Sequence, residues 1–375
     1  MRVLFASNPH PSHMFPMVPL AWGLRAAGHE ILLATTSDIL TKPTGLHVAD
    51  IAPGFDLGQA RLDLERDHPD VVQEMQSKPF MDMDGSAFLW ARMAAGPIGD
   101  GLVDIATAWR PDLVVYSQLW PAGLLAAAKL GVPAVSHGVG FMRTRDLEDR
   151  QFADMADIRE RHGVAELPPV RLTVDVSPES MAESDGFNVR YMPHNGGGEI
   201  PRWLLDEPAR KRITVTLGTV LLKRVGLRPV RRLIDEAAEV DAEFVLALGK
   251  VDYAELGPLP ANVRSGGWVP LTALLQTSHA VVHHAGSGTT FTALHAGIPQ
   301  LMLPVFGDQF VNAETVAARG AAISGTLEEI TAAQLERLLS DDSLVKSARD
   351  IRLEMAAMPT PAHLAHKLST VVHAA

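Results

Sequence analysis

The sequence contains no cysteine among its 375 residues. Disulfide bonds, thiolate metal sites and thiol-dependent catalysis are therefore excluded. No uninterrupted apolar run reaches the roughly 18 residues that a bilayer-spanning helix needs, although the mean hydropathy of +0.08 is high for a soluble chain. The opening residues, MRVLFASNPHPSHMFPM, show no basic segment leading into an apolar stretch. We therefore expect no signal peptide, no stable membrane insertion and a cytoplasmic location.

Basic residues are also scarce. Lys and Arg number 33 against 44 Asp and Glu, which gives a net charge of −11. Such a balance argues against a broad surface for nucleic acids or anionic membranes. The chain is 47% hydrophobic and 21% charged, a composition that excludes intrinsic disorder. Its length favours two domains, because single cores rarely grow this large.

Apolar runs rich in β-branched residues alternate with helical patterns along most of the chain. RVLFAS (2–7) and EILLATT (30–36) flank a helical pattern over residues 15–27, which Gly28 closes. Continuous apolar strands separated by helices predict an α/β fold with parallel sheets covered on both faces.

A glycine-rich stretch flanked by prolines, residues 196–210, interrupts this alternation and is typical of a hinge. We therefore predict an N-terminal domain over 1–195, a C-terminal domain over 211–359 and a final helix over 360–375.

The most informative stretch is AVVHHAGSGTTFTALHAG (280–297). A strand ends at His284, and a turn of small residues then opens a helix. The free N–H groups and the dipole at a helix N-terminus favour a phosphate. Ser287, Thr289 and Thr290 add hydroxyl groups at the same end. Since alternation places His283 and His284 on opposite faces, at most one of them faces a ligand.

Two phosphate ligands fit this turn. Gly286, Ser287 and Gly288 begin a dinucleotide fingerprint with Asp308 about twenty residues on, but Phe291 replaces its third glycine. The alternative is a nucleoside diphosphate sugar. His284 would then donate to the diphosphate, while Asp308 and Gln309 would bind sugar hydroxyls, since a carboxylate accepts hydrogen bonds and an amide both donates and accepts them.

Several strings together resemble a known family. GWVPL (267–271), VVHHAGSGTT (281–290) and IPQLMLPVFGDQFVNAETV (298–316) look like the donor-binding signature of inverting GT-B glycosyltransferases, most of all the bacterial antibiotic type that includes the calicheamicin enzymes. The resemblance spans nearly the whole chain. It implies two facing Rossmann-like domains, acceptor-binding and then donor-binding, with the last helix crossing back to the first domain.

The resemblance also implies roles for individual residues. Trp268 and Val269 would lie at the nucleobase, and Asp308 and Gln309 at the sugar. The residues expected around the diphosphate are Thr219, His284, Gly286, Ser287, Gly288 and Thr289. From the residues alone, the alternative for Trp268 is a core aromatic.

The loop after the first strand carries His10 and His13. Ligands in open α/β sheets bind beyond the carboxyl ends of strands, which places this loop on the functional edge. Family members carry Gly-His followed three residues later by proline, and Ser12-His13 with Pro16 matches this pattern with serine in place of glycine. His13 is thereby identified as a general base that removes the proton of an acceptor hydroxyl.

Relatives often place an acid just after the PDLVVY strand to orient this histidine, but Ser117 stands there in this chain. Serine can hydrogen-bond an imidazole but cannot stabilise imidazolium by charge. Either another acid serves, or His13 works unaided on an acidic phenol, or the acceptor chemistry is unusual.

Residues 70–95 are rich in methionine and aromatic side chains: Met75, Phe80, Met81, Met83, Phe88, Trp90 and Met93. They form either an ordinary core helix with a loop or an adaptable apolar wall for a large planar acceptor.

The function expected from the sequence is transfer of a deoxysugar from a TDP- or UDP-linked donor to an apolar natural-product aglycone. We expect inversion, and neither a metal nor a cofactor. The alternatives are a hydrolysing nucleotide-sugar epimerase and an auxiliary protein that only binds a nucleotide sugar. The oligomeric state, including a homodimer, stays open.

Overall fold

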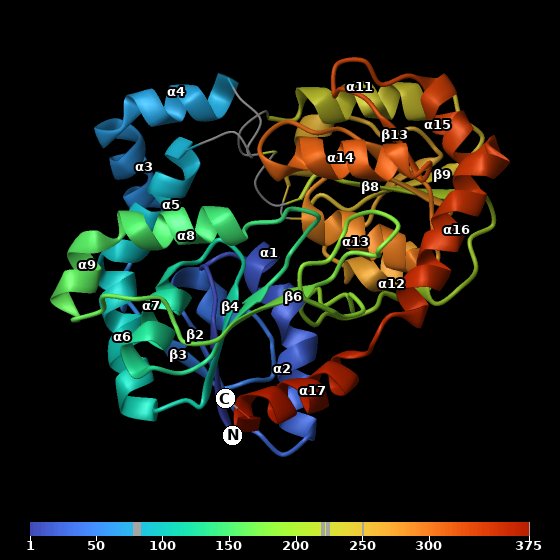
Figure 1. Cartoon of the computed structure of the whole chain (residues 1–375). Helices are drawn as coiled ribbons and strands as arrows, with labels where there is room; N and C mark the ends of the chain where they lie inside the picture. Colours follow the sequence, from blue (N-terminus) through green and yellow to red (C-terminus); the bar gives the residue numbers. More distant parts are fainter. Residues whose placement is uncertain (78–83, 219–221, 223–225, 250, 375) are drawn as a thin grey trace. The chain divides into compact units, whose positions relative to one another are not determined.

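The computed structural model describes residues 1–77, 84–218, 222, 226–249 and 251–374 (Figure 1). The chain divides into two compact units. The first comprises Met1–Ser177, Glu183–Arg190 and Met358–Ala375, and the second comprises Pro178–Ala182 and Tyr191–Ala357. Each unit contains a parallel sheet with helices packed against it, which confirms the predicted fold class.

The described part of the first unit contains a seven-stranded sheet in the order β3-β2-β1-β4-β5-β6-β7, and every pair is parallel. Its strands are β1 (Arg2–Ala6), β2 (Glu30–Thr35), β3 (Val48–Asp50), β4 (Leu113–Ser117), β5 (Ala134–His137), β6 (Arg171–Asp175) and β7 (Phe187–Asn188). The strands β1, β4 and β5 are almost wholly buried, as their continuous apolar runs predict.

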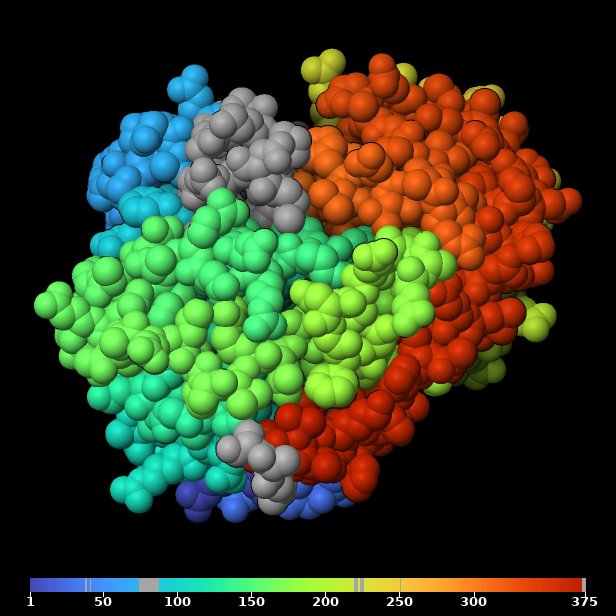
Figure 2. All heavy atoms as spheres, in the orientation of Figure 1, coloured from blue at the N-terminus to red at the C-terminus, as the bar shows by residue number. Residues whose placement is uncertain are grey.

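The helices of this unit are α1 (Pro11–Met14), α2 (Val18–Ala26), α3 (Leu57–Asp67), α4 (Pro69–Ser77), α5 (Asp84–Ala95), α6 (Pro97–Trp109), α7 (Ala122–Leu130), α8 (Arg145–Asp154), α9 (Ala156–Arg161) and α17 (Pro361–Ala374). In the space-filling view, α8 and α9 form part of the surface in green (Figure 2). The pattern over 15–27 predicts one helix, but the structure has a 3-10 turn, Phe15–Met17, before α2. Pro16 and Pro19 explain the break, because proline has no N–H for a helical hydrogen bond.

The last helix packs against the first unit. A Cβ added at Gly23 in α2 would lie 2.9 Å from the carbonyl oxygen of Pro361, at the start of α17. The predicted return of the C-terminal helix to the first domain is therefore confirmed.

The described part of the second unit contains a six-stranded sheet in the order β10-β9-β8-β11-β12-β13, again parallel throughout. Its strands are β8 (Arg212–Thr216), β9 (Glu243–Leu246), β10 (Val263–Ser265), β11 (Ala280–His283), β12 (Gln300–Met302) and β13 (Ala322–Ser324). Its longer helices are α11 (Arg228–Ala237), α12 (Leu271–Gln276), α13 (Ser287–Ala296), α14 (Asp308–Ala318), α15 (Ala332–Ser340) and α16 (Asp342–Ala357).

The parallel arrangement brings the carboxyl ends of the strands of each unit to one edge of its sheet. In the first unit, the loops after β1, β4 and β5 begin at this edge, and in the second unit those after β8, β11 and β12 do so. These loops carry most of the residues that the sequence singles out. No helix among the described residues is both long and apolar enough to span a bilayer.

Gly123 allows α7 to pack directly on β4. A Cβ at this position would lie 2.2 Å from Cβ of Tyr116, a distance at which the helix must move. We expect Gly123→Ala to lower the free energy of unfolding by about 3 kcal/mol. Gly197→Ala is the control, because its added Cβ meets nothing within 4 Å. Equal urea midpoints for the two variants would contradict this packing.

Candidate functional site

The turn between β11 and α13 has an unusual backbone. Ala285 adopts a left-handed conformation, with φ of 63°, although it is not glycine and is fully buried. Such a conformation costs free energy and is found where the surroundings impose it, often at functional sites. Asn312 Nδ2 donates a hydrogen bond to the Ala285 carbonyl at 2.9 Å. Gly286 follows as the N-cap of α13, whose first N–H groups have no acceptor within the helix.

The two adjacent histidines have different environments, as the strand alternation predicts. His283 is fully buried, and its Nδ1 accepts a hydrogen bond from the Ala285 N–H. Its Nε2 lies 2.8 Å from Oε1 of Gln300. Both of its ring nitrogens are therefore used within the core. His284 is partly exposed, and its buried Nδ1 has no hydrogen-bond partner among the described residues. Burial lowers the pKa of His284 to about 4, so the ring is neutral near pH 7.

The ring of His284 lies against glycine backbone on two strand ends. A Cβ at Gly286 would lie 2.4 Å from its Nε2, and a Cβ at Gly218 would lie 2.6 Å from its Cε1. Gly218 also has a positive φ of 68°. These contacts explain why the strings TLGT and HHAGSG carry glycine where they do. Thr219, the predicted diphosphate contact in TLGT, lies outside the described residues.

Two hydroxyl groups of the turn bind within the protein, whereas the sequence predicts that they are available to a phosphate. Ser287 Oγ donates to Asp308 Oδ2 at 2.7 Å, and Thr290 Oγ1 donates to the Gly286 carbonyl at 3.1 Å. Both hydroxyl protons are therefore used within the protein instead of pointing to an anion. Thr289 is partly exposed at the helix end, and an added Cβ at Gly288 would meet nothing within 4 Å. The free space lies at the helix N-terminus, where the sequence predicts the phosphate.

Asp308 and Gln309 begin α14. Burial raises the pKa of Asp308, while hydrogen bonds from Ser287 and Asn312 act in the opposite direction. Gln309 is 3% exposed, and its Oε1 accepts hydrogen bonds from the backbone N–H groups of Val305, at 2.9 Å, and Phe306. This leaves its amide N–H groups, not its oxygen, for a ligand.

Asn312 is the residue that the sequence reasoning missed. It is 1% exposed, and besides Ala285 its Nδ2 contacts Ser287 Oγ at 3.1 Å and Asp308 Oδ2 at 3.2 Å. Its position four residues after Asp308 on a helix was a usable signal, because such residues share a face.

Trp268 and Val269 lie in the loop between β10 and α12. The side chain of Trp268 is 62% exposed, so the core-aromatic interpretation is wrong. Val269 packs beside the buried cluster of Leu204, Val245 and Leu274. An exposed indole held by an anchored neighbour is suited to stacking on a planar ring.

In the first unit, His13 lies in the short helix α1. Its ring is 6.0 Å from that of Trp90, centroid to centroid, and its Nδ1 is buried without a hydrogen-bond partner among the described residues. Burial lowers the pKa of His13 to about 3; His10 adds to this effect, while the nearby backbone of Gln118 opposes it. His13 is therefore neutral near pH 7.

Ser117 is fully buried at the end of β4, and its Oγ accepts a hydrogen bond from the Asn8 N–H at 3.2 Å. Within the described part of the chain, no hydrogen bond joins Ser117 to His13. The serine–imidazole hydrogen bond that the sequence allows is not among these contacts, and the hydroxyl instead accepts from the backbone of the loop after β1.

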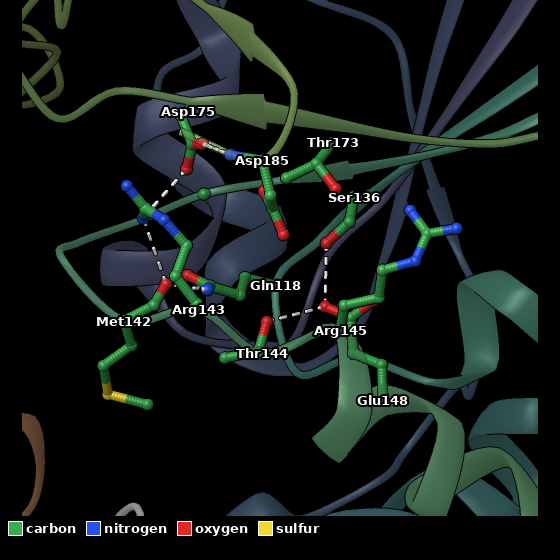
Figure 3. Close-up of a pocket in the computed structure, with 11 residues that line it drawn as sticks. Gln118, Ser136, Met142, Arg143, Thr144, Arg145, Glu148, Thr173, Asp175 and Asp185 are labelled. Atoms are coloured by element: carbon green, nitrogen blue, oxygen red, sulfur yellow. Dashed lines mark hydrogen bonds and ion pairs between the residues drawn. The ribbon is translucent and has the colours of Figure 1, made fainter. Parts of the chain in front are cut away.

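Next to Ser117, a polar pocket opens at the ends of β4, β5 and β6 (Figure 3). Glu148, 1% exposed, accepts hydrogen bonds from the hydroxyls of Tyr116, Ser136 and Thr144 at 2.6–2.9 Å. Burial raises the pKa of Glu148. Gln118 Nε2 donates to the Met142 carbonyl at 2.7 Å. These bonds fix the β4 end whose backbone adjoins His13.

The described part of the methionine-rich and aromatic segment has both buried and partly exposed side chains. In α5, Leu89, Ala91 and Ala94 are buried, as the core-helix interpretation predicts. Trp90, in contrast, lies beside His13. Phe80, Met81 and Met83 lie outside the described residues.

Among the residues that the structure describes, no cluster of three His, Asp or Glu side chains could hold a metal ion. The two Rossmann-like units, the glycine turn with its helix N-terminus and the following Asp-Gln pair define a GT-B glycosyltransferase.

Comparison with solved structures supports this class. The glycosyltransferase SnogD from Streptomyces nogalater is 37% identical, with 99% of each chain covered and a TM-score of 0.87. The glycosyltransferase VinC, solved in complex with DTDP, is 31% identical over the full length of both chains, with a TM-score of 0.82. The GT-B fold is thereby confirmed.

Models of the erythromycin biosynthesis protein CIII-like N-terminal and C-terminal domains match residues 22–218 and 231–371. Elloramycin glycosyltransferase ElmGT of Streptomyces olivaceus is 38% identical, covering 99% of this chain and 97% of its own. The 3-alpha-mycarosylerythronolide B desosaminyl transferase of Saccharopolyspora erythraea is 30% identical, and the match covers 97% of this chain and 96% of that protein. The chain belongs to this family and is a glycosyltransferase of the bacterial antibiotic type. The narrower likeness to the calicheamicin enzymes stays a prediction.

The contacts of Asn312 predict a large effect of its loss. Asn312→Ala leaves the Ala285 carbonyl without its side-chain donor and removes one side-chain donor from Asp308, so we expect the free energy of unfolding to fall by about 2 kcal/mol. Glu314→Ala, an exposed position on the same helix, is the control and should change it by less than about 0.5 kcal/mol. Similar losses in the two variants would show that the Asn312 contacts contribute little.

The low pKa of His284 predicts a pH effect on stability. Between about pH 6.5 and pH 4, the His284 ring is protonated in the unfolded chain but stays neutral in the folded chain, where its pKa is about 4. The free energy of unfolding therefore decreases as the pH falls through this range. His284→Asn lacks this titrating ring. As the pH falls, its free energy of unfolding should therefore rise relative to that of the wild type by up to about 1.4 kcal/mol per pH unit. Urea titrations at several pH values measure the difference, and parallel pH dependences would contradict the burial of a neutral ring.

Proposed function

We propose that the protein transfers a deoxysugar from a TDP- or UDP-linked donor to an apolar natural-product aglycone, with inversion at the anomeric carbon. Names of relatives support this choice. The L-demethylnoviosyl transferase of Streptomyces niveus, 37% identical, is named for its sugar, and glycosyltransferase SsfS6 was solved with thymidine diphosphate.

The observation that carries the donor half is the open space around Gly288 at the N-terminus of α13, preceded in the chain by the partly exposed ring of His284. A diphosphate there would accept hydrogen bonds from this ring and from the free N–H groups of Gly288 and Thr289. The ring donates as the neutral tautomer with its proton on the nitrogen facing the ligand. The helix dipole and these donors stabilise the departing diphosphate without any cationic side chain.

The remaining donor contacts are inferred from the exposure of side chains and from polar atoms that make no hydrogen bond within the protein. Trp268 offers its exposed face to the nucleobase, and Val269, anchored in the core, presents its backbone beside it. Asp308 uses Oδ2 within the protein, so its other oxygen would accept from a sugar hydroxyl, while the Gln309 amide would donate. We keep Thr219 as a diphosphate contact from the family resemblance.

On the acceptor side, His13 is the proposed general base, with Trp90 as part of the apolar wall for the aglycone. The acceptor hydroxyl would give its proton to His13 while its oxygen bonds to the anomeric carbon and the bond from that carbon to the diphosphate breaks. A ring whose pKa is held at about 3 is a weak base, which favours an acidic hydroxyl such as that of a phenol. Ser117 would act only by holding the loop that carries His13.

Substitution of His13 tests this assignment. With a TDP-sugar and a panel of phenolic aglycones, His13→Ala should lower kcat by about 10²- to 10⁴-fold, because proton removal is lost. The thermal shift caused by TDP should be unchanged, because the proposed donor residues all lie in the other unit. His47→Ala, at an exposed histidine of the first unit, should keep wild-type kcat.

Two outcomes would contradict the proposal. Full activity of His13→Ala would remove the base assignment. A thermal shift with NAD and none with TDP or UDP would overturn the donor class, because a bound ligand stabilises the folded chain by an amount that grows with the logarithm of its concentration over its dissociation constant.

A further inference from the structure

The loop between β1 and α2 carries a helix too short to be stable by itself. Helix α1 has four residues, Pro11–Met14, and helices of this length form only where other contacts fix them. One such contact is the burial of Met14, which is 1% exposed. The position of His13 therefore depends on what holds the two ends of this single turn.

His10 caps the amino end of α1. Its backbone is extended, and its carbonyl accepts hydrogen bonds from the N–H groups of His13, at 3.1 Å, and Met14, at 3.2 Å. Its ring Nδ1 accepts from the Ser12 N–H at 3.3 Å and lies 2.7 Å from Ser12 Oγ. Since the amide can only donate, Nδ1 of the ring carries no proton and its lone pair faces the turn. An imidazole thus takes the place of the usual Asp, Asn, Ser or Thr cap.

The same loop is hydrogen-bonded to the end of β4 through a residue two positions before His10. The His10 N–H donates to the Asn8 carbonyl at 2.7 Å, and the Asn8 N–H donates to Ser117 Oγ. Ser12 and Ser117 are positions at which this chain differs from the pattern of the family it resembles. Each departure supplies a hydroxyl that contacts this loop.

We propose that His10 and Ser12 are positioning residues that, with Ser117, hold His13 in the geometry for proton removal in place of an orienting acid. The proposal rests on the proposed role of His13 as the base. It predicts that changes at His10 act through His13, and so on kcat, without touching the donor site in the other unit. Placement matters because a displacement of about 1 Å in a reacting group can cost up to about 100-fold in rate.

The decisive variants are His10→Ala, which removes the acceptor, and His10→Asn, whose side-chain oxygen can accept from the Ser12 N–H. We expect His10→Ala to lower kcat about tenfold and His10→Asn to recover it to within about threefold of the wild type. Ser12→Gly removes the hydroxyl contact but keeps the amide donor, so it should lower kcat about threefold, less than His10→Ala does. The TDP thermal shift should be the same in all three variants.

A double variant separates positioning from a general loss of structure. If His10 acts only through His13, then His10→Ala adds no further loss in the His13→Ala background. A further loss there, equal losses in His10→Ala and His10→Asn, or a wild-type kcat in His10→Ala would each overturn the proposal. Activity in His13→Ala would overturn the base assignment as well, whereas an inactive His13→Ala with an active His10→Ala would overturn the positioning role alone.

Discussion

The parallel register of the two sheets is the constraint on which the rest of the structure depends. Because neighbouring strands run in one direction, the residues after β1, β4 and β5 meet at one edge of the first sheet, and those after β8, β11 and β12 meet at one edge of the second. Groups far apart in sequence become neighbours in this way. Asn8 contacts Ser117, and Gly218 contacts His284, only because their strands pair in register.

At the edge of the second sheet, backbone N–H groups take the role that charged side chains have in other anion sites. The left-handed Ala285, held by Asn312, turns the chain into the N-cap Gly286, after which the first N–H groups of α13 have no acceptor within the helix. Glycine at positions 218 and 286 leaves room for the His284 ring beside them. A chain of net charge −11 can thereby offer a local binding site for a diphosphate without a basic surface.

The fold and the outline of the site follow from the sequence, because strand alternation, glycine turns and helix caps are local signals. The inward direction of the Ser287 hydroxyl does not, since it depends on the burial of Asp308 on a different helix. The same holds for Ser117, whose partner Asn8 comes from another strand end, and for Trp268, whose exposure depends on loop packing. In each case the residue type allowed several partners, and tertiary packing chose among them.

A neutral, crowded imidazole at His13 has a consequence for catalysis. Burial disfavours the imidazolium ion, and no side chain among the described residues forms an ion pair with this ring, so under the proposed mechanism a proton accepted from the acceptor hydroxyl would be costly. Proton transfer would then be favoured late, when the attacking oxygen is already bonding to the anomeric carbon and its hydroxyl is most acidic. This timing makes the orientation of the ring matter more than its basicity, and orientation is what the hydrogen bonds of His10, Ser12 and Ser117 supply.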